Sequence, residues 1–288
     1  MGTPTWVIPL LEKAFPHRNK LARMTQVPLV AEALHHTIFN GDNLIYLPKD
    51  EVVVHQTIEQ PGSILLPSAL VDHFIEKASY RWIMDFCICR ESDHCQNYPH
   101  DLGCIFLGDA VLNISSKIGH LASIEEALAH VRRARELGLV HLIGRDRIDN
   151  LWTGAQPFGR LMTICQCCPC CCLFKMLPHL DLLNRSKVTR MPGVKVWVES
   201  QNCSTCGACT EQICFVDAIQ IHGDSAQISE ECRGCGRCVE VCPQEAIHLT
   251  IEDSDFLQKQ IARITALVDV TKKRLVPRWK LKKRTVEE

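Results

Sequence analysis

Apolar residues recur at intervals of three and four positions between residues 67 and 78, a spacing that places them on one face of a helix. The residues on that face are Leu70, Val71, Phe74, Ile75 and Ala78. We therefore expect a helix that starts near Pro67 and Ser68 and leads to Cys87, the first cysteine of the chain.

A second helix is expected to start at Ser123. Glu126 lies three residues after this serine, and the pair forms a capping box that satisfies backbone N–H groups at a helix start. The apolar face consists of Ile124, Ala127, Leu128, Val131 and Ala134. Gly138 is placed to end this helix, and the apolar run 139–143 predicts a buried strand after it.

Shorter patterns predict further elements. The apolar runs 52–54 and 64–66 are typical of short strands. Residues 219–222 and 226–228 flank the turn sequence Gly223-Asp224-Ser225, which predicts a hairpin. A last helix is expected from an apolar face that consists of Leu257, Ile261, Ile264, Leu267 and Val268.

The end of the chain is basic, because residues 272–284 carry a run of Lys and Arg. An amphipathic helix with a basic end suits an acidic partner or an anionic membrane surface, although a helix packed on the body with a solvated tail is the commoner arrangement. Trp279 is the only aromatic residue in this tail, so nucleic-acid binding is not favoured.

Composition narrows the class of protein. The chain has 288 residues, of which 46% are hydrophobic, enough for two domains and at least one core. Its 32 Lys and Arg nearly balance its 33 Asp and Glu, so no overall charge attracts nucleic acid. It has no run of 18 apolar residues, and its amino end lacks the features of a secretory signal, so we expect a soluble, cytoplasmic protein.

The outlying feature is the number of cysteines, which is 18. In a reducing compartment thiols are metal ligands or redox groups more often than structural disulfides. The three groups are Cys87, Cys89, Cys95 and Cys104; Cys165, Cys167, Cys168, Cys170, Cys171 and Cys172; and Cys203, Cys206, Cys209, Cys214, Cys232, Cys235, Cys238 and Cys242. This clustering predicts a Cys-rich domain at 1–190, a second domain at 195–252 and a cysteine-free end at 253–288.

The third group is an internal repeat. Its first three cysteines recur 29 positions later, and Cys214 recurs 28 positions later as Cys242. Each copy offers three thiolates in a tight loop to one [4Fe-4S] cube and a fourth, after a short helical turn, to the other cube. Gly234 and Gly236 allow the backbone to approach the cube closely. The expected ligand sets are Cys203, Cys206, Cys209 and Cys242 for one cluster, and Cys232, Cys235, Cys238 and Cys214 for the other.

At its eight ligand positions this segment resembles the two-cluster bacterial-type ferredoxins. It departs from them in its first copy, where four residues rather than three separate Cys209 from Cys214, and where Phe215 replaces the usual proline. The resemblance implies a small pseudo-twofold domain that transfers electrons. A structural zinc site is the alternative, but it needs only four cysteines and leaves the other four unexplained.

The first two cysteine groups have spacings that match neither a zinc finger nor a ferredoxin loop. The six thiols between Cys165 and Cys172 cannot all face one metal, because neighbours in an extended chain point to opposite sides. Together with the segments 104–108 and 138–141, these cysteines resemble a module of uncharacterised 4Fe-4S dicluster-domain proteins of anaerobic bacteria and archaea. That resemblance implies additional iron–sulfur binding, without an assignment of ligands.

We expect a subset of these amino-proximal cysteines to hold one further cluster, with ligands from both groups. A zinc or mixed thiolate site, and metal-free thiols active in disulfide exchange or sulfur transfer, are the alternatives. Arg90 is expected to lower the pKa of a neighbouring thiol or to contact a cluster, or else to form a surface ion pair. His94, His100 and His141 lie near the cysteines, but such histidines are more often surface or core residues.

The sequence thus predicts an α+β protein in which a small 2[4Fe-4S] ferredoxin-like domain is appended to a mixed α/β Cys-rich domain. We expect it to pass single electrons from a ferredoxin-like donor to the upstream Cys-rich site or to a partner oxidoreductase. A reductase whose amino-proximal site is the reaction centre, and a sulfur-relay or redox-sensing protein, are the alternatives. The chain has no Rossmann glycine fingerprint and no Walker loop, which favours an electron carrier over a stand-alone enzyme.

Overall fold

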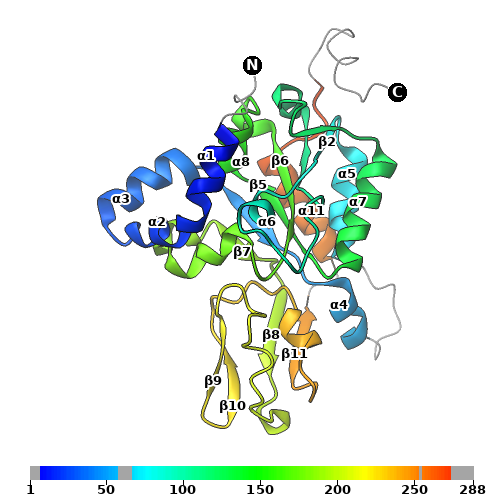
Figure 1. The fold of residues 1–288 in the computed structure, drawn as a ribbon. Helices are drawn as coiled ribbons and strands as arrows, with labels where there is room; N and C mark the ends of the chain where they lie inside the picture. The colour runs from blue at the N-terminus through cyan, green and yellow to red at the C-terminus, as the bar shows by residue number, and fades with distance from the viewer. Residues whose placement is uncertain (1–6, 58–66, 253–254, 274–288) are drawn as a thin grey trace.

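The structure is a computed structural model that describes residues 7–57, 67–252 and 255–273. A mixed seven-stranded sheet with helices on both sides forms the body, and a smaller lobe of two strand pairs projects from one end of it (Figure 1). Helices and sheet are both prominent, so the predicted α+β class is confirmed.

The sheet of the body has the spatial order β4-β2-β3-β6-β5-β1-β7. All neighbouring pairs are antiparallel except β1 and β7, which are parallel. Strands β2, β6, β1 and β7 therefore point the same way, and their carboxyl ends share one edge of the sheet. The bounds are β1 Asn43–Tyr46, β2 Arg81–Met84, β3 Ile105–Leu107, β4 Gly119–Leu121, β5 Val140–Arg145, β6 Met162–Cys167 and β7 Val188–Arg190.

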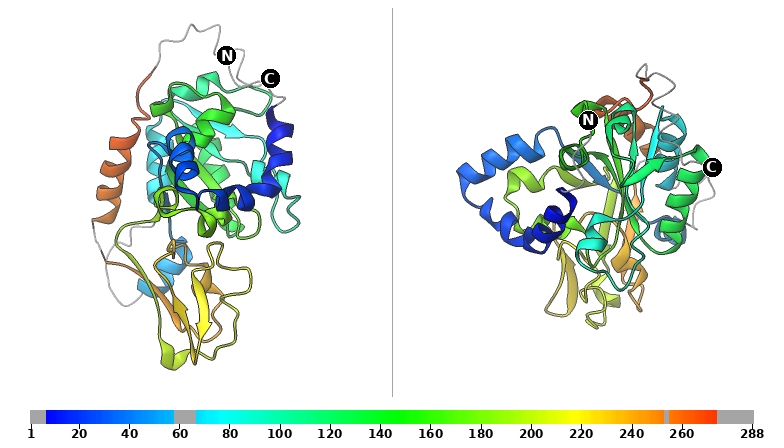
Figure 2. Two further views of the ribbon diagram at one scale, coloured as in Figure 1. Left: turned by 90° about the vertical axis from the view of Figure 1, so that its left-hand side faces the viewer. Right: turned by 45° about the horizontal axis from the view of Figure 1, so that its top comes forward.

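Different helices cover the two faces of this sheet (Figure 2). Helices α5 (Ser68–Lys77), α7 (Ile124–Glu136) and α11 (Phe256–Leu267) pack on one face, where their apolar residues form a core with alternate residues of the strands. On the other face a second core joins α2 (Arg18–Met24) to the 3-10 helix η5 (Leu173–His179). Both faces of the sheet are thus buried.

The remaining helical segments are all shorter than α5, α7 and α11. No helix in the described ranges is long and apolar enough to span a membrane. The bounds are α1 Val7–Ala14, η1 Phe15–His17, α3 Pro28–Leu34, η2 His35–Phe39, α4 Asp50–Thr57, α6 Ile88–Ser92, η3 Asp109–Asn113, α8 Arg147–Thr153, η4 Phe158–Arg160, α9 Leu182–Arg185, η6 Ser200–Asn202 and α10 Arg237–Glu240.

The lobe is attached to the body at both ends. Only residues 191–193 separate β7 from β8 (Val194–Val198), which pairs antiparallel with β11 (Ile247–Ile251). Strands β9 (Ile219–His222) and β10 (Ser225–Ile228) form the predicted hairpin. After β11 the chain returns to the body, where α11 packs beside α5.

The stronger sequence patterns agree with the structure. The helices predicted from residues 67 and 123 are α5 and α7, the strand predicted at 139–143 is β5, and the last predicted helix is α11. The backbone N–H of Glu126 donates to the Ser123 hydroxyl at 3.1 Å, as the capping box requires. Gly138 ends α7 with a φ of 72°.

The strand predicted at 52–54 is wrong, because these residues lie inside α4. Asp50 and Glu51 occupy the first turn of α4, where acidic side chains favour a helix. Val52 and Val53 are buried in the core shared with the lobe, so packing outweighs the strand preference of β-branched residues. The strand predicted at 64–66 and most of the basic tail lie outside the described residues.

Candidate metal centres

The topology of the sheet brings the first two cysteine groups together. Cys87 follows β2, Cys104 precedes β3, and the Cys-rich run occupies the end of β6 and the loop after it. Because β3 lies between β2 and β6 and runs opposite to both, all of these positions fall at one edge of the sheet. Tyr46, at the end of β1, and the start of the lobe after β7 belong to the same edge.

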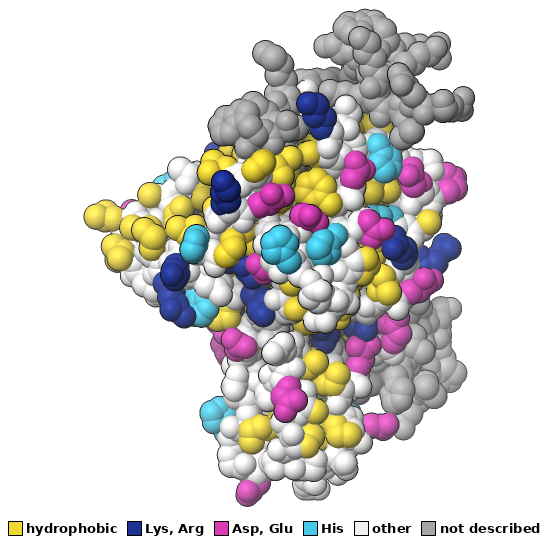
Figure 3. Space-filling view, in the orientation of Figure 1, with side chains coloured by type: hydrophobic (Ala, Val, Ile, Leu, Met, Phe, Trp, Pro, Cys, Tyr) yellow, Lys and Arg dark blue, Asp and Glu magenta, His cyan; other side chains and the backbone are white. Residues whose placement is uncertain are grey.

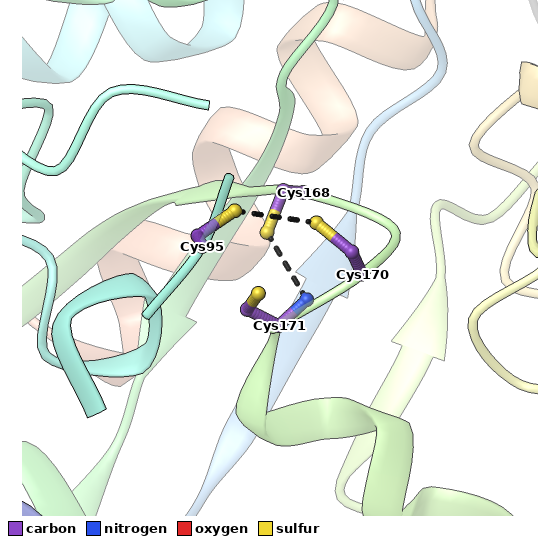
Figure 4. A group of neighbouring side chains, drawn as sticks. All are labelled: Cys95, Cys168, Cys170 and Cys171. Atoms are coloured by element: carbon purple, nitrogen blue, oxygen red, sulfur yellow. Dashed lines mark hydrogen bonds between the residues drawn. The ribbon is translucent and has the colours of Figure 1, made fainter. Parts of the chain in front are cut away.

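Four of these cysteines form a compact cluster, the four-thiol group (Figure 4). Its members are Cys95, Cys168, Cys170 and Cys171, whose sulfur atoms all lie within 4.8 Å of one another. The sulfurs of Cys95 and Cys170 are 3.5 Å apart, and the backbone N–H of Cys171 donates to the Cys168 sulfur at 3.3 Å. Within the described ranges no other group of three or more His, Cys, Asp or Glu residues converges this closely.

The spacing of the four-thiol group bears on the metal it suits. Four thiolates are a donor set for zinc and for iron–sulfur clusters alike. Tetrahedral bonds of about 2.3 Å to a single zinc ion place the sulfurs about 3.8 Å apart, which is within the observed range. A cube holds its thiolates farther apart, since the iron–sulfide core lies between them. The geometry therefore suits one tetrahedral ion better than a cube.

The other cysteines of the first two groups form the six-thiol group, which consists of Cys87, Cys89, Cys104, Cys165, Cys167 and Cys172. Cys165 and Cys167 stand two residues apart on β6, so their side chains point to the same face. The sulfurs of Cys104 and Cys165 are 3.3 Å apart. The Tyr46 hydroxyl lies 3.5 Å from the sulfur of Cys167 and 3.5 Å from that of Cys172.

Arg90 is fully buried beside these thiols, so the expected alternative of a surface ion pair is wrong. Its guanidinium donates to three backbone carbonyl oxygens, those of Pro99, Leu102 and Gln166. The pKa of the Cys87 thiol is lowered to about 7, chiefly by its hydrogen bond with Cys89 and, against the effect of burial, also by the Arg90 charge. Arg90 thus favours a thiolate, as the other expectation stated.

A second buried arginine, Arg237, enters from the lobe. It donates to the backbone carbonyl of Cys167. The pKa of the Cys167 thiol lies well below its ordinary value because Cys165 and Cys172 donate hydrogen bonds to its sulfur, and the charge of Arg237 acts in the same direction. Cys167 is therefore favoured as a thiolate.

The eight cysteines of the lobe line two small cavities. The first is lined by Cys203, Cys206, Cys209 and Cys242, and the second by Cys214, Cys232, Cys235 and Cys238. Each cavity takes three cysteines from one copy of the repeat and one from the other. This grouping supports the crossed ligand sets, which stay a prediction until iron is located.

The backbone of the lobe repeats along with its cysteines. The Cys214 sulfur accepts a hydrogen bond of 3.3 Å from the N–H of Ala218, and the Cys242 sulfur accepts one of 3.3 Å from Ala246. Positive φ angles recur at equivalent positions, which are Thr205 and Gly234, Gly207 and Gly236, and Asp217 and Glu245. The extra residue of the first copy is accommodated near Gln212, which has a φ of 59° and no counterpart in the second copy.

The second cavity of the lobe fits an anionic cluster with positive metal ions. Burial raises the pKa of Cys232 to about 11 and also raises that of Cys235, because a buried thiolate loses its hydration. Arg237 lines the same cavity, and its Nη1 is buried with no hydrogen-bond partner among the described residues. Iron would stabilise the thiolates, and sulfide or thiolate sulfur would accept from Arg237.

Phe215 connects the lobe to the six-thiol group. It follows Cys214, and its ring centroid lies 4.6 Å from that of Tyr46. Tyr46 in turn contacts the sulfurs of Cys167 and Cys172. The position at which the sequence departs from the ferredoxin pattern is therefore an aromatic contact between two cysteine sites. No spacing in the sequence pointed to Tyr46 or Arg237.

The three histidines near the cysteines lie in different environments. In His100, Nδ1 lies 2.7 Å from a carboxylate oxygen of Glu91 and Nε2 lies 2.9 Å from the Cys95 carbonyl oxygen, so both ring nitrogens are engaged. His141 is buried on β5, and burial lowers its pKa to about 4. His94 lies in a turn with a φ of 48°.

Comparison with known proteins identifies one segment of the lobe. Residues 227–248 match the family described as 4Fe-4S binding domain, and they contain the second copy of the cysteine repeat. No curated protein and no solved structure matched the chain. The chain thus carries an iron–sulfur binding segment, which indicates a role in electron transfer.

Proposed function

We propose that this protein transfers single electrons through two [4Fe-4S] clusters in the lobe to the cysteines at the sheet edge of the body, or to a partner oxidoreductase. The observation that carries this proposal is the grouping of the eight cysteines around two cavities. Cys235 and Phe215, which line one of them, contact the body. Clusters held in this way exchange one electron at a time without rearranging the protein.

The difference in exposure between the two cavities supports the proposed order of transfer. Cys206, at the first cavity, is exposed, whereas the second cavity faces the body. At that contact the backbone N–H of Lys49 donates to the carbonyl of Cys235 at 3.2 Å, and Phe215 touches Tyr46. A soluble donor would therefore meet the cluster at Cys206, and the cluster beside Phe215 would pass electrons onward.

The four-thiol group has a structural role in this proposal. A single tetrahedral ion there would tie Cys95, which follows α6, to the loop 168–172. That loop also carries Cys172 of the six-thiol group. The ion would fix the receiving end of the path without itself accepting electrons, if it is zinc.

The decisive experiment is a metal inventory of the full chain purified without oxygen. Two cubes require about eight irons and about eight acid-labile sulfides per chain. Fewer than about eight irons in well-folded protein would overturn the proposal. An exchange of electrons with a soluble ferredoxin, followed by the visible absorbance of the clusters, should occur without any small-molecule substrate, and its absence would contradict the carrier role.

A further inference from the structure

The six-thiol group lies on the floor of a large cavity in the body. All six cysteines line this cavity, whose volume is about 670 Å³. Cys89, Cys104 and Cys165 are half-buried although they lie within the body, and they face this cavity. Small-molecule sites in proteins typically have volumes of about 300–1,000 Å³, so the cavity is of the size that holds a ligand.

The six sulfurs are linked but do not converge on one point. Cys104 touches Cys165 at 3.3 Å, Tyr46 lies between Cys167 and Cys172, and a thiol hydrogen bond joins Cys87 to Cys89. The four-thiol group, by contrast, fits within 4.8 Å. Each close pair has the spacing of two thiolates on one ion, and six thiolates exceed the four that one tetrahedral ion can bind, so the group suits a centre with several irons. Arg90 and Arg237 are the buried cations beside it.

The walls above the thiols are mostly apolar. They come from the helices between residues 7 and 39 on one side and from η5 on the other. Typical wall residues are Phe15, Leu34, Ile38, Phe174 and Met176. A surface of this kind binds apolar molecules by removing them from water.

The charged residues that line the cavity have partners in the protein. Arg18 donates to both carboxylate oxygens of Asp93, at 3.0 and 2.5 Å. Arg90 is held by backbone carbonyls, and Asp149 accepts from the Trp152 indole N–H at 2.9 Å. These engaged groups would lose bonds on binding a charged ligand, so the site favours an uncharged one.

The cavity has an apolar mouth. Leu21, Met24 and Leu29 line it, yet their exposed fractions are 52%, 53% and 80%. Figure 3 shows hydrophobic side chains gathered on this side of the molecule, over α2 and α3. An apolar molecule would therefore reach the thiols through a rim of the same character.

We propose that the six-thiol group binds a polynuclear iron–sulfur centre, and that the cavity above it binds an uncharged, apolar small molecule in contact with that centre. The inference rests on the proposed function, because Phe215 and Tyr46 are the route by which the lobe would supply electrons to the site. The apolar molecule is then placed where an electron acceptor of the protein would bind.

The first test counts iron in the full chain and in the Cys104→Ser/Cys165→Ser variant, both purified without oxygen. We expect about twelve or more irons in the unmodified protein and a loss of about four in the variant, with the lobe spectrum unchanged. The control, Cys95→Ser/Cys170→Ser, changes the four-thiol group and should lose at most about one iron. If the first variant does not fold, Cys87→Ser/Cys89→Ser replaces it, and the count in the unmodified protein decides.

The outcomes separate the two proposals. About eight irons in the unmodified protein, with intact lobe signals, would overturn the six-thiol centre and leave the electron-transfer function standing. Fewer than about eight would overturn the electron-transfer function itself.

The second test uses (trifluoromethyl)benzene as an uncharged apolar probe and measures its ¹⁹F line width by NMR. We expect saturable broadening that is stronger in the reduced, paramagnetic protein than in the oxidised one. Leu34→Trp and Ile38→Trp place a larger side chain in the cavity, so each should abolish the saturable broadening and leave the iron content unchanged. The control Leu183→Trp lies on the exposed surface of α9 and should leave the broadening as it is. Broadening that is absent from the unmodified protein, or that persists in both filled variants, would overturn the ligand site.

Discussion

The lobe and the sheet edge both gather cysteines, but they do so by different means. In the lobe, each cavity receives three cysteines from a loop with fixed spacing and a fourth from the equivalent position of the other copy. At the sheet edge, the cysteines come from three strands and the segments next to them, which the fold alone brings together. The comparison shows that local spacing encodes the first kind of site and topology encodes the second.

The two regions also differ in what surrounds the thiols. In the lobe, small cavities enclose the cysteines, and backbone N–H groups donate to their sulfur atoms. This environment has room for an iron–sulfur cluster but not for a small-molecule ligand beside it. Both regions contain a buried arginine, Arg237 in the lobe and Arg90 at the sheet edge, but the sheet edge also has a cavity of about 670 Å³. A carrier needs the first environment, and a site that also binds a small molecule needs the second.

The largest expected effect tests the crossing of ligands in the lobe. Cys203→Ser and Cys242→Ser change different copies but the same cavity, so we expect both to lose about four irons and to leave the same residual EPR spectrum. Cys232→Ser should lose a similar amount and leave the other spectrum. If Cys242→Ser instead matches Cys232→Ser, each copy holds its own cluster and the crossed sets are wrong.

Arg90→Leu is the strongest single change expected in the body. It removes a buried cation and leaves three carbonyl oxygens without a donor, so the free energy of unfolding should fall by about 3–5 kcal/mol. Urea denaturation under argon, followed by circular dichroism, measures this change. As a control, Arg133→Leu removes an arginine that forms an exposed ion pair with Asp101 and should cost no more than about 1 kcal/mol. Equal losses would contradict the role given to Arg90.

Gly236→Ala tests the junction between lobe and body. Gly236 has a φ of 84°, and an added Cβ would lie 3.1 Å from the Val52 side chain. We expect a loss of about 1–2 kcal/mol from the backbone conformation alone, with a further cost from the contact. A double-mutant cycle with Val52→Ala should recover only the contact part. Gly223→Ala, which also has a positive φ but meets nothing within 4 Å, is the control for backbone strain.

The smallest effect concerns pH and belongs to the body. Burial lowers the pKa of His120, but hydrogen bonds of 2.8 Å to Glu126 and 3.0 Å to Asp85 raise it above its ordinary value. Its ion pairs therefore stabilise the fold below pH 6.5, and this stabilisation is lost as the pH rises through the folded-state pKa. His120→Gln should lower the unfolding free energy by up to about 1 kcal/mol at pH 5.5 and by less at pH 8. A loss that is equal at both pH values would contradict this assignment.

Much of the fold was predictable where a local signal governs it. Ser123 and Glu126 indicated the start of α7, and the apolar segments on either side of Gly223-Asp224-Ser225 indicated the hairpin. The strand predicted at 52–54 was wrong because a run of β-branched residues favours a strand when it is considered alone. The acidic residues before it and the packing of its side chains favour a helix instead.

The candidate sites at the sheet edge were less accessible to sequence reasoning. The residues are adjacent only because β3 lies between β2 and β6, and no pattern along the chain reveals that order. The sequence indicated that the first two cysteine groups share a site. It could not show that Cys95 belongs to the four-thiol group and Cys87 to the six-thiol group. Tyr46 carries no motif, and its position against Phe215 depends on where the lobe meets the body.

The attachment of the lobe at both ends has a consequence for its motion. Residues 191–193 connect the body to the start of the lobe, and α11, which follows the lobe, packs on the body. Both ends of the lobe are therefore held, which restricts its motion relative to the body. A domain on a single flexible linker samples a range of distances from its target site. In this protein the fold fixes the distance between Cys214 and Tyr46. The rate of electron transfer between the lobe and the body should therefore not change with the viscosity of the solvent.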